Sequence, residues 1–362
     1  MKKLLVVSAV NIVNGGPLTI LKSFLDALQD SAFAEWRVVA LVNPAVNLEF
    51  GCVERMDFSL PKRAWLLRVV YEYWVFKKLS VQMKPDVWLS LHDMTPNVSA
   101  PKQFVYCHNP APFYKVSFLE MLLDPKFYIF NKLYLSFYRI NINKNRCVIV
   151  QQQWMKRVLG EITSAPIHVS HPEYVAPELP ATVGSAGNQL VFFYPAFPRI
   201  FKNHEVLCRA IEYLSAEVKD KVRIVFTIRG DENLYARSLE LRFGRIPQIQ
   251  FVGHLSYSQT QEILSQSTGL LFPSKLETWG LPLTEGKHMG KPIITADLEY
   301  AKETVGDYGD VAFVDPDDPK AWAFAITNLC RLEGKISLPG NRQIAAPDSV
   351  GPEALLSYLL NS

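Results

Sequence analysis

One stretch in the C-terminal third of the chain, residues 269–286, strongly limits the folds open to it. Its first four residues, Gly269 to Phe272, are apolar, which is typical of a strand buried on both faces of a parallel sheet. Pro273-Ser274 ends that strand, and after a short loop Gly280-Leu281-Pro282 opens a predicted helix from Leu283 to Met289. A buried strand that leads through a loop into a helix is the repeating unit of α/β proteins with parallel sheets.

Two carboxylates bracket the turn ahead of this helix: Glu277 in the loop and Glu285 on the helix. A helix N-terminus carries unpaired N–H groups and partial positive charge, which suit a phosphate. The stretch could therefore bind a nucleotide sugar, with its diphosphate on the amides around Gly280 and Leu281, its sugar on Glu277 and its ribose on Glu285. The spacing alone fits equally well a strand–loop–helix unit with two solvated glutamates.

The whole chain of 362 residues repeats this alternation and is long enough for two domains. A stretch rich in Pro, Ala, Gly and Ser, residues 172–187, is the candidate linker. We predict two parallel-sheet domains, over residues 1–172 and 188–345. The predicted strands are 4–10, 36–42, 86–91, 103–107, 147–151, 189–194, 222–228, 249–252, 269–272, 292–295 and 311–314, and the predicted helices are 18–28, 62–79, 154–159, 204–214, 234–243, 259–266, 283–289, 319–332 and 350–360.

Composition argues against several classes of protein. The five cysteines show no paired spacing, which is typical of buried thiols in a reducing compartment. Met1-Lys2-Lys3 leads directly into a predicted strand that is too short for a signal peptide, and no run of 18 apolar residues predicts a transmembrane helix. No His, Asp or Glu cluster has metal-ligand spacing, and no Ser-His-Asp arrangement or phosphate-loop motif is present. We therefore expect a cytoplasmic protein without a metal site or a nucleic-acid partner.

Charge is unevenly divided along the chain. Residues 1–172 hold 20 Lys and Arg against 12 Asp and Glu, a net charge of +8, whereas residues 173–362 hold 18 against 23, a net charge of −5. A basic first half is compatible with a domain that faces an anionic surface. Residues 62–79 and 113–146 also mix aromatic with basic side chains, although a helix buried in the protein core can show the same composition.

Polar residues that follow predicted strands are candidates for chemistry, because ligands bind at the carboxyl ends of parallel strands. Arg199 and Lys202 follow the first strand of the second domain and could clamp a diphosphate. The same residues are also consistent with a solvated basic loop that binds no ligand. His108 ends a strand of the first domain and could hydrogen-bond a sugar, although a lone histidine is more often structural. His92 also ends a strand, and we interpret it as structural or acceptor-side.

Two adjacent glycines, Gly15 and Gly16, separate the first predicted strand from the first predicted helix. Such a pair lets the backbone approach a ligand closely. The turn lacks the Gly-x-Gly-x-x-Gly pattern, so the sequence does not predict a dinucleotide-binding fingerprint. A tight turn with no ligand fits this pair equally well.

The residues of the stretch 269–286, which we call the organising stretch, resemble those of a known family. The stretch is similar to the Glu-x7-Glu region of family-4 retaining glycosyltransferases of the GT-B fold. It contains Pro-Ser-x-x-Glu, then Gly-Leu-Pro, and then a second Glu eight residues after the first. Trp279 stands where the family usually has Phe, and Thr284-Glu285-Gly286 stands where it often has Leu-Glu-Ala. The resemblance extends from about Gln189 to Leu332 and is weaker over the first half.

The resemblance implies roles for residues in both halves. Lys202-Asn203-His204 resembles the lysine phrase of the family's Arg…Lys pair, with Arg199 at a shorter spacing than usual. Cys107-His108-Asn109-Pro110 resembles the family's histidine. The family's donor-side residues map onto Gly15, Gly16, Gly253, Trp279, Gly280, Leu281 and Glu285, while Glu303 matches its Glu-x-Val-Gly phrase and is interpreted as structural.

The family implies two doubly wound Rossmann-like domains facing each other across a cleft, with a C-terminal helix near 350–362 crossing back to the first domain. It implies a retaining hexosyltransferase that uses a nucleotide-diphosphate sugar and in which Arg199 and Lys202 replace a metal. His108 would contact the sugar, Glu277 would orient it and Glu285 would hold the ribose. A nucleotide-sugar epimerase or phosphorylase on the same fold, or a non-catalytic sugar-nucleotide-binding protein, are the alternatives. No lysine in the organising stretch suggests a pyridoxal phosphate anchor, which argues against the phosphorylase.

The expected acceptor is a saccharide or a lipid-linked saccharide in bacterial cell-surface polysaccharide assembly, such as O-antigen, lipopolysaccharide or capsule. Many relatives in the family build on lipid-linked acceptors. Together with the basic first half, this predicts a peripheral protein on an anionic membrane, at the inner face of the plasma membrane. We also expect the two domains to close over the donor.

Overall fold

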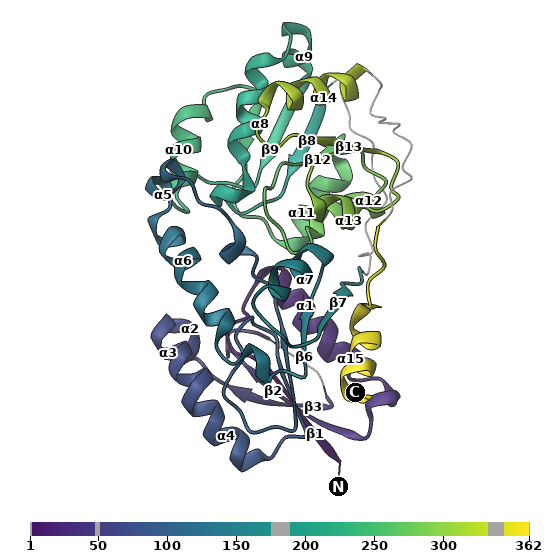
Figure 1. Ribbon diagram of the computed structural model, residues 1–362. Helices are drawn as coiled ribbons and strands as arrows, with labels where there is room; N and C mark the ends of the chain where they lie inside the picture. Colours follow the sequence, from purple (N-terminus) through teal and green to yellow (C-terminus); the bar gives the residue numbers. More distant parts are fainter. Residues whose placement is uncertain (1, 48–50, 175–188, 332–343, 362) are drawn as a thin grey trace. The chain divides into compact units, whose positions relative to one another are not determined.

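The computed structural model describes residues 2–47, 51–174, 189–331 and 344–361. The chain divides into two compact units (Figure 1). Unit 1 comprises Met1–Phe113, Asn131–Glu173 and Ala345–Ser362, and unit 2 comprises Tyr114–Phe130 and Tyr174–Ile344. The predicted division differs at residues 114–130, which group with unit 2 and not with the first domain. Most of the predicted linker lies outside the described residues.

Unit 1 is built on an eight-stranded sheet in which every pairing is parallel, with the order β14-β7-β6-β5-β4-β1-β2-β3. The runs 4–10, 36–42, 86–91, 103–107 and 147–151 were expected as strands, and each contains one. Three further strands, β3, β7 and β14, are short or lie toward the sheet edges. The strands are β1 Lys3–Ala9, β2 Trp36–Val42, β3 Val53–Asp57, β4 Val87–Ser90, β5 Lys102–Tyr106, β6 Cys147–Val150, β7 Ile167–His171 and β14 Ser349–Val350.

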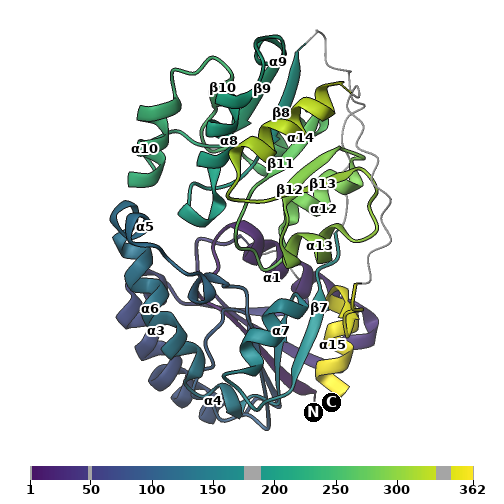
Figure 2. The ribbon, with the colours of Figure 1, turned by 45° about the horizontal axis from the view of Figure 1, so that its top comes forward.

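Helices on both faces bury the apolar side chains of this sheet. On one face, α1 (Gly15–Ala27) and α15 (Gly351–Asn361) share a core with β1, β2 and β5, in which Leu21, Phe24, Leu356 and Tyr106 are buried. The C-terminal helix therefore packs on unit 1, beside β7 (Figure 2). The other face carries Phe76 against the β-sheet residues, and α7 (Gln153–Gly160) precedes β7.

The helix predicted over residues 62–79 is wrong as a single element. The structure has α2 (Leu60–Arg63), α3 (Trp65–Val70), a π-helical stretch (Tyr71–Val75) and α4 (Phe76–Met83). Ala64 has an extended backbone, with φ −150° and ψ 143°, which separates α2 from α3. The buried side chains Arg68 and Glu72 come from these segments, so their inward face is partly polar.

Two helices cover the aromatic, basic stretch of the sequence. α5 (Phe118–Leu123) begins with a capping box formed by Ser117 and Glu120. Asp124 follows, and its carboxylate accepts the backbone N–H of Phe127 at 3.0 Å in the first turn of α6 (Pro125–Arg139). Helix α6 lies beside α3 (Figure 2), where the rings of Trp65 and Phe137 are 4.0 Å apart.

Unit 2 is built on a six-stranded parallel sheet with the order β10-β9-β8-β11-β12-β13. All six strands were predicted from the sequence. The strands are β8 Leu190–Tyr194, β9 Val222–Phe226, β10 Ile249–Phe251, β11 Gly269–Phe272, β12 Ile293–Ala296 and β13 Val311–Val314. The helices are α8 His204–Ala210, α9 Ala216–Lys221, α10 Leu234–Phe243, α11 Tyr257–Gln266, α12 Leu281–His288, α13 Glu299–Val305 and α14 Pro319–Arg331. Two parallel α/β sheets thus confirm the predicted fold class.

Candidate active site

Two loops of unit 2 are tied together by hydrogen bonds. One follows β8 and the other follows β11, and these strands are neighbours in the sheet. The backbone N–H of Lys275 donates to the carbonyl of Phe201 at 2.7 Å, and the Asn203 amide donates to the carbonyl of Pro273 at 3.3 Å. Asn203 has a left-handed backbone, with φ 56°, which turns the chain from the first loop into α8. Because both loops extend from carboxyl ends of parallel strands, they occupy the edge where ligands bind in such sheets.

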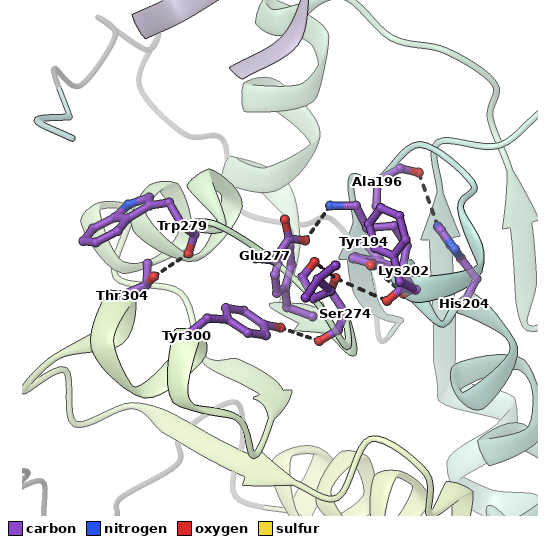
Figure 3. A network of polar contacts seen from close by, with 12 residues as sticks. Tyr194, Ala196, Lys202, His204, Ser274, Glu277, Trp279, Tyr300 and Thr304 are labelled. Carbon is purple, nitrogen blue, oxygen red and sulfur yellow. Dashed lines mark hydrogen bonds and ion pairs between the residues drawn. The ribbon is translucent and has the colours of Figure 1, made fainter. Parts of the chain in front are cut away.

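This arrangement brings together two of the predicted site residues (Figure 3). The Lys202 Nζ lies 2.5 Å from Glu277 Oε1, and the side chains are 20% and 13% exposed. The Tyr194 hydroxyl, buried beneath the loop, donates to the Lys202 carbonyl at 2.7 Å. The loop backbone is thereby fixed while the ammonium and the carboxylate remain within reach of solvent. A cation for phosphate and an acceptor for sugar hydroxyls therefore stand side by side.

The loop that carries Glu277 is anchored on α13. The Tyr300 hydroxyl donates to the Ser274 carbonyl at 2.5 Å, and the Thr304 hydroxyl donates to the Trp279 carbonyl (Figure 3). Trp279 is itself buried, and its indole N–H donates to the Thr284 hydroxyl at 2.9 Å. In this structure the Trp279 ring therefore supports the loop from inside, and its contact with a donor stays a prediction.

Gly280 gives the chain its turn into α12. Its φ is +88°, and a Cβ at this position would lie 3.3 Å from Leu283 Cδ1 and 3.3 Å from Phe272 Cε1. Both the backbone conformation and the crowding favour glycine. The N-terminus of α12 follows directly at Leu281, two residues earlier than predicted, so its first amides come just after the Glu277 loop.

Glu285 lies on the same helix in a buried setting, with 6% of its surface exposed. Burial raises the pKa of its carboxyl to about 7, and Gln261 of α11 opposes part of that rise. Tyr174 is close by, because its hydroxyl donates to Gln261 Oε1 at 3.4 Å. A carboxyl with this pKa exchanges its proton near neutral pH and can either accept or donate a hydrogen bond.

Arg199 shares the loop of Lys202 but has a different partner. Its Nη1 lies 3.3 Å from Asp124 Oδ2, and its guanidinium stacks on the ring of Phe197. The ring of Phe127 packs 5.4 Å from that of Phe201, so residues 114–130 contact this loop within unit 2. Sequence reasoning missed Asp124, since no motif links it to Arg199.

Two further predicted residues of unit 2 have backbone settings that fit their predicted roles. Gly253 has a φ of +79°, and its N–H donates to the carbonyl of Ile228 at 2.9 Å, so the loop after β10 turns back on the end of β9. Glu303 lies half-buried on α13. The binding role of Gly253 and the structural role of Glu303 stay predictions.

The remaining predicted residues lie in unit 1. Gly15, with φ +69°, and Gly16 begin α1 directly after the loop that follows β1. His108 follows β5, and its ring stacks on that of Tyr106 at 4.3 Å. Burial lowers the pKa of His108 to about 4, so its imidazole is neutral near pH 7. Its Nε2 atom is buried and makes no hydrogen bond to a described residue.

His92 belongs to a buried polar cluster that the sequence did not predict. Its Nε2 lies 3.1 Å from Ser8 Oγ and 3.4 Å from Glu72 Oε1, and the Arg68 guanidinium donates to the His92 carbonyl. His92 is 4% exposed and Glu72 is fully buried. This placement agrees with the structural interpretation of His92.

Among the residues that the structure describes, no group of three or more His, Cys, Asp or Glu side chains could hold a metal ion. The same described ranges contain no helix that is both long and apolar enough to cross a membrane. The two predicted cations of unit 2 each lie close to a carboxylate, Lys202 at 2.5 Å from Glu277 and Arg199 at 3.3 Å from Asp124.

Solved structures with the same architecture define the class of fold. A sucrose-phosphate synthase from Thermosynechococcus elongatus superposes with a TM-score of 0.69 over 91% of this chain and 90% of its own, at 15% identity. HepE of Anabaena, solved with UDP-glucose, superposes with a TM-score of 0.63 over 100% of this chain and 95% of its own, at 12% identity. The fold is therefore that of the GT-B proteins.

The sequence then gives the family. Residues 177–341 match the family of glycosyl transferases group 1, which confirms the resemblance over that part of the chain. The O-antigen chain mannosyltransferase RfbU of Salmonella typhimurium is 29% identical over 90 residues. That match spans 25% of this chain and 25% of the length of that curated relative.

Proposed function

We propose that the protein transfers a hexose from a nucleotide-diphosphate sugar to a saccharide or lipid-linked saccharide, with retention of anomeric configuration. The observation that carries this proposal is the Lys202–Glu277 pair, which stands at the carboxyl ends of β8 and β11 beside the N-terminus of α12. The family match supports glycosyl transfer. RfbU, an O-antigen chain mannosyltransferase, supports a mannosyl donor and a role in bacterial cell-surface polysaccharide assembly.

Each charged side chain of the site has a task in this reaction. The bond between the anomeric carbon and the diphosphate oxygen breaks, the diphosphate leaves with the electron pair, and the acceptor hydroxyl forms the new glycosidic bond as its proton passes to the departing diphosphate. Lys202 and Arg199 stabilise the negative charge that develops on the leaving diphosphate. Glu277 accepts hydrogen bonds from the sugar, the amides of Gly280 and Leu281 bind a phosphate, and Glu285 holds the ribose.

His108 contributes as a neutral acceptor. Because the pKa of its imidazole is lowered to about 4, the ring carries no charge near pH 7, and the unpartnered Nε2 can accept a hydrogen bond from a sugar hydroxyl. A buried acceptor without a partner is costly, so a ligand hydroxyl at this atom is favourable.

A panel of nucleotide-diphosphate sugars that includes GDP-mannose and UDP-glucose tests the proposal. We expect one donor to release nucleoside diphosphate in the presence of an acceptor saccharide, with the anomeric signal of the product, read by NMR, matching that of the donor. Interconversion of nucleotide sugars without release would instead support the epimerase, and donor binding without turnover would support a non-catalytic binding protein.

We also propose that the protein works on an anionic membrane surface. In each of the stretches 62–79 and 113–146, some apolar side chains are buried in the protein core and others are exposed to solvent. Phe76, Phe127 and Tyr134 are buried. Leu66 (74%) and Val70 (43%) of α3, Trp74 (61%) of the π-helical stretch and Val81 (53%) of α4 are exposed. A Trp and aliphatic side chains on an exposed helical face are typical of insertion at the headgroup level.

Helix α6 has the same division. Ile129 and Leu133 of α6 and Ile140 directly after it are exposed, at spacings of four and seven residues, and Lys126, Lys132 and Arg139 are exposed as well. Each basic residue close to an anionic bilayer contributes on the order of 1 kcal/mol, so several suffice for reversible attachment. The site of action would then be the inner face of the plasma membrane, where lipid-linked acceptors are extended.

Co-sedimentation with vesicles of phosphatidylglycerol and phosphatidylcholine at low salt tests this second proposal. We expect binding that weakens as salt rises and that is lost when Lys126, Lys132 and Arg139 are changed to Glu. A matched control changes three exposed basic residues of unit 2, Arg237, Arg245 and Lys320, to Glu. Equal loss in both triple variants would point to overall charge and would count against a specific surface on α6.

A further inference from the structure

Asp93 joins two strand-end loops of unit 1. It follows β4 with a left-handed backbone, φ 70°, a conformation that Asp and Asn adopt more readily than most residues. Its Oδ1 accepts the backbone N–H of His108 at 2.5 Å and that of Asn109 at 2.9 Å. One carboxylate oxygen thus holds the two consecutive amides of the loop that presents His108.

Helix α6 completes the coordination of this carboxylate. The Tyr138 hydroxyl lies 3.1 Å from Oδ1 and the Tyr134 hydroxyl lies 3.2 Å from Oδ2. The Tyr138 hydroxyl is also 2.9 Å from the Asn109 carbonyl. Both tyrosines are at most 2% exposed. The carboxylate is therefore saturated by protein donors, so it is poorly suited to act as a base or as a direct ligand of a substrate.

The histidine itself is held on its other sides. Its ring stacks on Tyr106 and hydrogen-bonds the backbone carbonyl of Leu91, while its Nε2 has no hydrogen-bond partner among the described residues. Because Nε2 is the atom without a partner, Nδ1 carries the proton that is donated to Leu91, and the lone pair of Nε2 is left free. The direction of that lone pair depends on where the His108 backbone is held.

We propose that Asp93 is a positioning residue, which fixes the His108 backbone and thereby aims Nε2 of His108 at a hydroxyl of the donor sugar. This inference rests on the proposed function, in which His108 contacts that sugar. Without the carboxylate, the two backbone amides and the Tyr134 hydroxyl lose their acceptor, and the loop relaxes. A displacement of about 1 Å at a reacting centre costs about 10²-fold in rate.

Two substitutions separate the carboxylate from the backbone conformation. Asp93→Gly accepts φ 70° without strain but removes both oxygens, whereas Asp93→Asn tolerates the same conformation and keeps one acceptor for the two amides. We expect Asp93→Gly to lower kcat about 10²-fold with little change in the donor KM, and Asp93→Asn to recover most of that loss. If the residue serves only the backbone turn, Asp93→Gly will be as active as Asp93→Asn, and the proposal fails.

The double variant with His108→Ala tests whether Asp93 acts through His108. We expect Asp93→Gly to cost little in a chain that already carries His108→Ala, because the side chain to be aimed is gone. If the double variant loses kcat by the product of the two single losses, the two residues act independently. That result would overturn the positioning role while leaving His108 as a sugar contact. An active His108→Ala protein would instead contradict the role of His108 in the proposed function. The positioning role of Asp93 would then fail as well, because it acts through His108.

Selective 15N labelling of histidine gives a readout that does not depend on turnover. In the wild-type protein we expect His108 to show a protonated Nδ1 and an unprotonated Nε2 across the neutral range. In Asp93→Gly we expect these two shifts to move toward each other as the tautomers mix, while thermal unfolding shows that the variant is folded. Unchanged His108 shifts in a folded Asp93→Gly protein would overturn the proposal.

Discussion

Lys202 and Glu277 are partners of each other, so each keeps the other's charge in place at a partly buried edge of the sheet. A donor diphosphate would compete with Glu277 for the ammonium, and a sugar hydroxyl would compete with Lys202 for the carboxylate. In the proposed reaction the pair would hold both groups in place before the donor binds, at little cost in reorganisation.

Removal of either partner is expected to impair transfer much more than folding. Lys202→Ala or Glu277→Ala should lower kcat/KM by about 10²- to 10³-fold, the usual cost of one group that stabilises transition-state charge. Steady-state release of nucleoside diphosphate measures the rate, and circular dichroism checks the fold. Lys275→Ala is the matched control, because Lys275 lies in the same loop but pairs with Asp317. Near wild-type turnover in either site variant would remove that residue from the mechanism.

Glu72 predicts how stability depends on pH. Burial raises the pKa of its carboxyl to about 8, so the folded chain keeps a proton that the unfolded chain releases near pH 4.5. The stabilisation is therefore present at low pH and is lost as pH rises toward the folded pKa. Burial lowers the pKa of the neighbouring His92, which has the opposite effect below pH 6.5, so Glu72 dominates between about pH 6.5 and 8.

The change that isolates this effect is Glu72→Gln. We expect the melting temperature of the wild-type protein to fall between about pH 6.5 and 8, and the Glu72→Gln protein to show a smaller fall because its amide does not titrate. Differential scanning calorimetry at closely spaced pH values measures both. Parallel curves for the two proteins would mean that Glu72 is already ionised in the folded state.

At the residue scale, short motifs in the sequence identified two side chains that the fold brings together, and their roles stay predictions. Lys202 and Glu277 stand in local phrases after predicted strands, and the fold brings them within 2.5 Å. Asp93 and Asp124 were missed, because their partners His108 and Arg199 are reached only through the tertiary fold. Arg68 and Glu72 were read as part of an aromatic, basic helix, since nothing in their local pattern shows that they are buried.

At the scale of elements, α12 depends on the glycine that precedes it. Gly280→Ala adds a Cβ at φ +88° and 3.3 Å from Leu283 and Phe272, so both strain and crowding oppose it. We expect a loss of about 1–3 kcal/mol in stability, together with weaker nucleotide binding, because the first amides of α12 shift. Chemical denaturation and titration with the nucleoside diphosphate measure the two effects.

Gly290 supplies the control for that prediction. It also has a positive φ, +63°, but a Cβ there has no neighbour within 4 Å. Gly290→Ala therefore carries the backbone strain without the crowding, and it lies at the far end of α12. We expect it to cost about 1–2 kcal/mol in stability while nucleotide affinity is retained. Equal loss of affinity in both variants would argue against a phosphate contact at the N-terminus of α12.

The segments between residues 60 and 83 show where element prediction from sequence fails. Apolar side chains occur nearly all around this stretch, so helical periodicity predicts one continuous helix. The break at Ala64 and the π-helical stretch Tyr71–Val75 have no strong sequence signal, since neither proline nor glycine marks them. The central parallel strands were easier, because they are short apolar runs, whereas the edge strand β3, with the sequence VERMD, gave no such signal.

At the scale of the molecule, alternation of strands and helices was enough to predict two parallel sheets. It could not assign residues 114–130, because their membership in unit 2 rests on contacts of Asp124 and Phe127 with a loop more than 70 residues later. The order of strands within each sheet was likewise not readable from the chain, since only the final pairing shows it.

The complete protein is expected to work without a divalent metal. In the proposed mechanism, Lys202 and Arg199 would supply the positive charge with which a metal could otherwise stabilise the leaving diphosphate. Turnover with the accepted donor should therefore be unchanged by an excess of EDTA, and added Mg²⁺ or Mn²⁺ should not raise it. Loss of activity with the chelator, restored by either ion, would contradict this prediction and would direct attention to carboxylates such as Glu277.

The last residues of the chain return to unit 1, where β14 pairs with β7 and α15 buries Leu355, Leu356 and Leu359 in the first core. The ribosome synthesises the chain from its N-terminus, so β14 and α15 emerge only after the whole of unit 2. The edge strand β7 of the first sheet is therefore paired late. During that interval β7 and the apolar side chains of α1 stay uncovered. A nascent chain stalled before residue 344 would therefore present that face to chaperones.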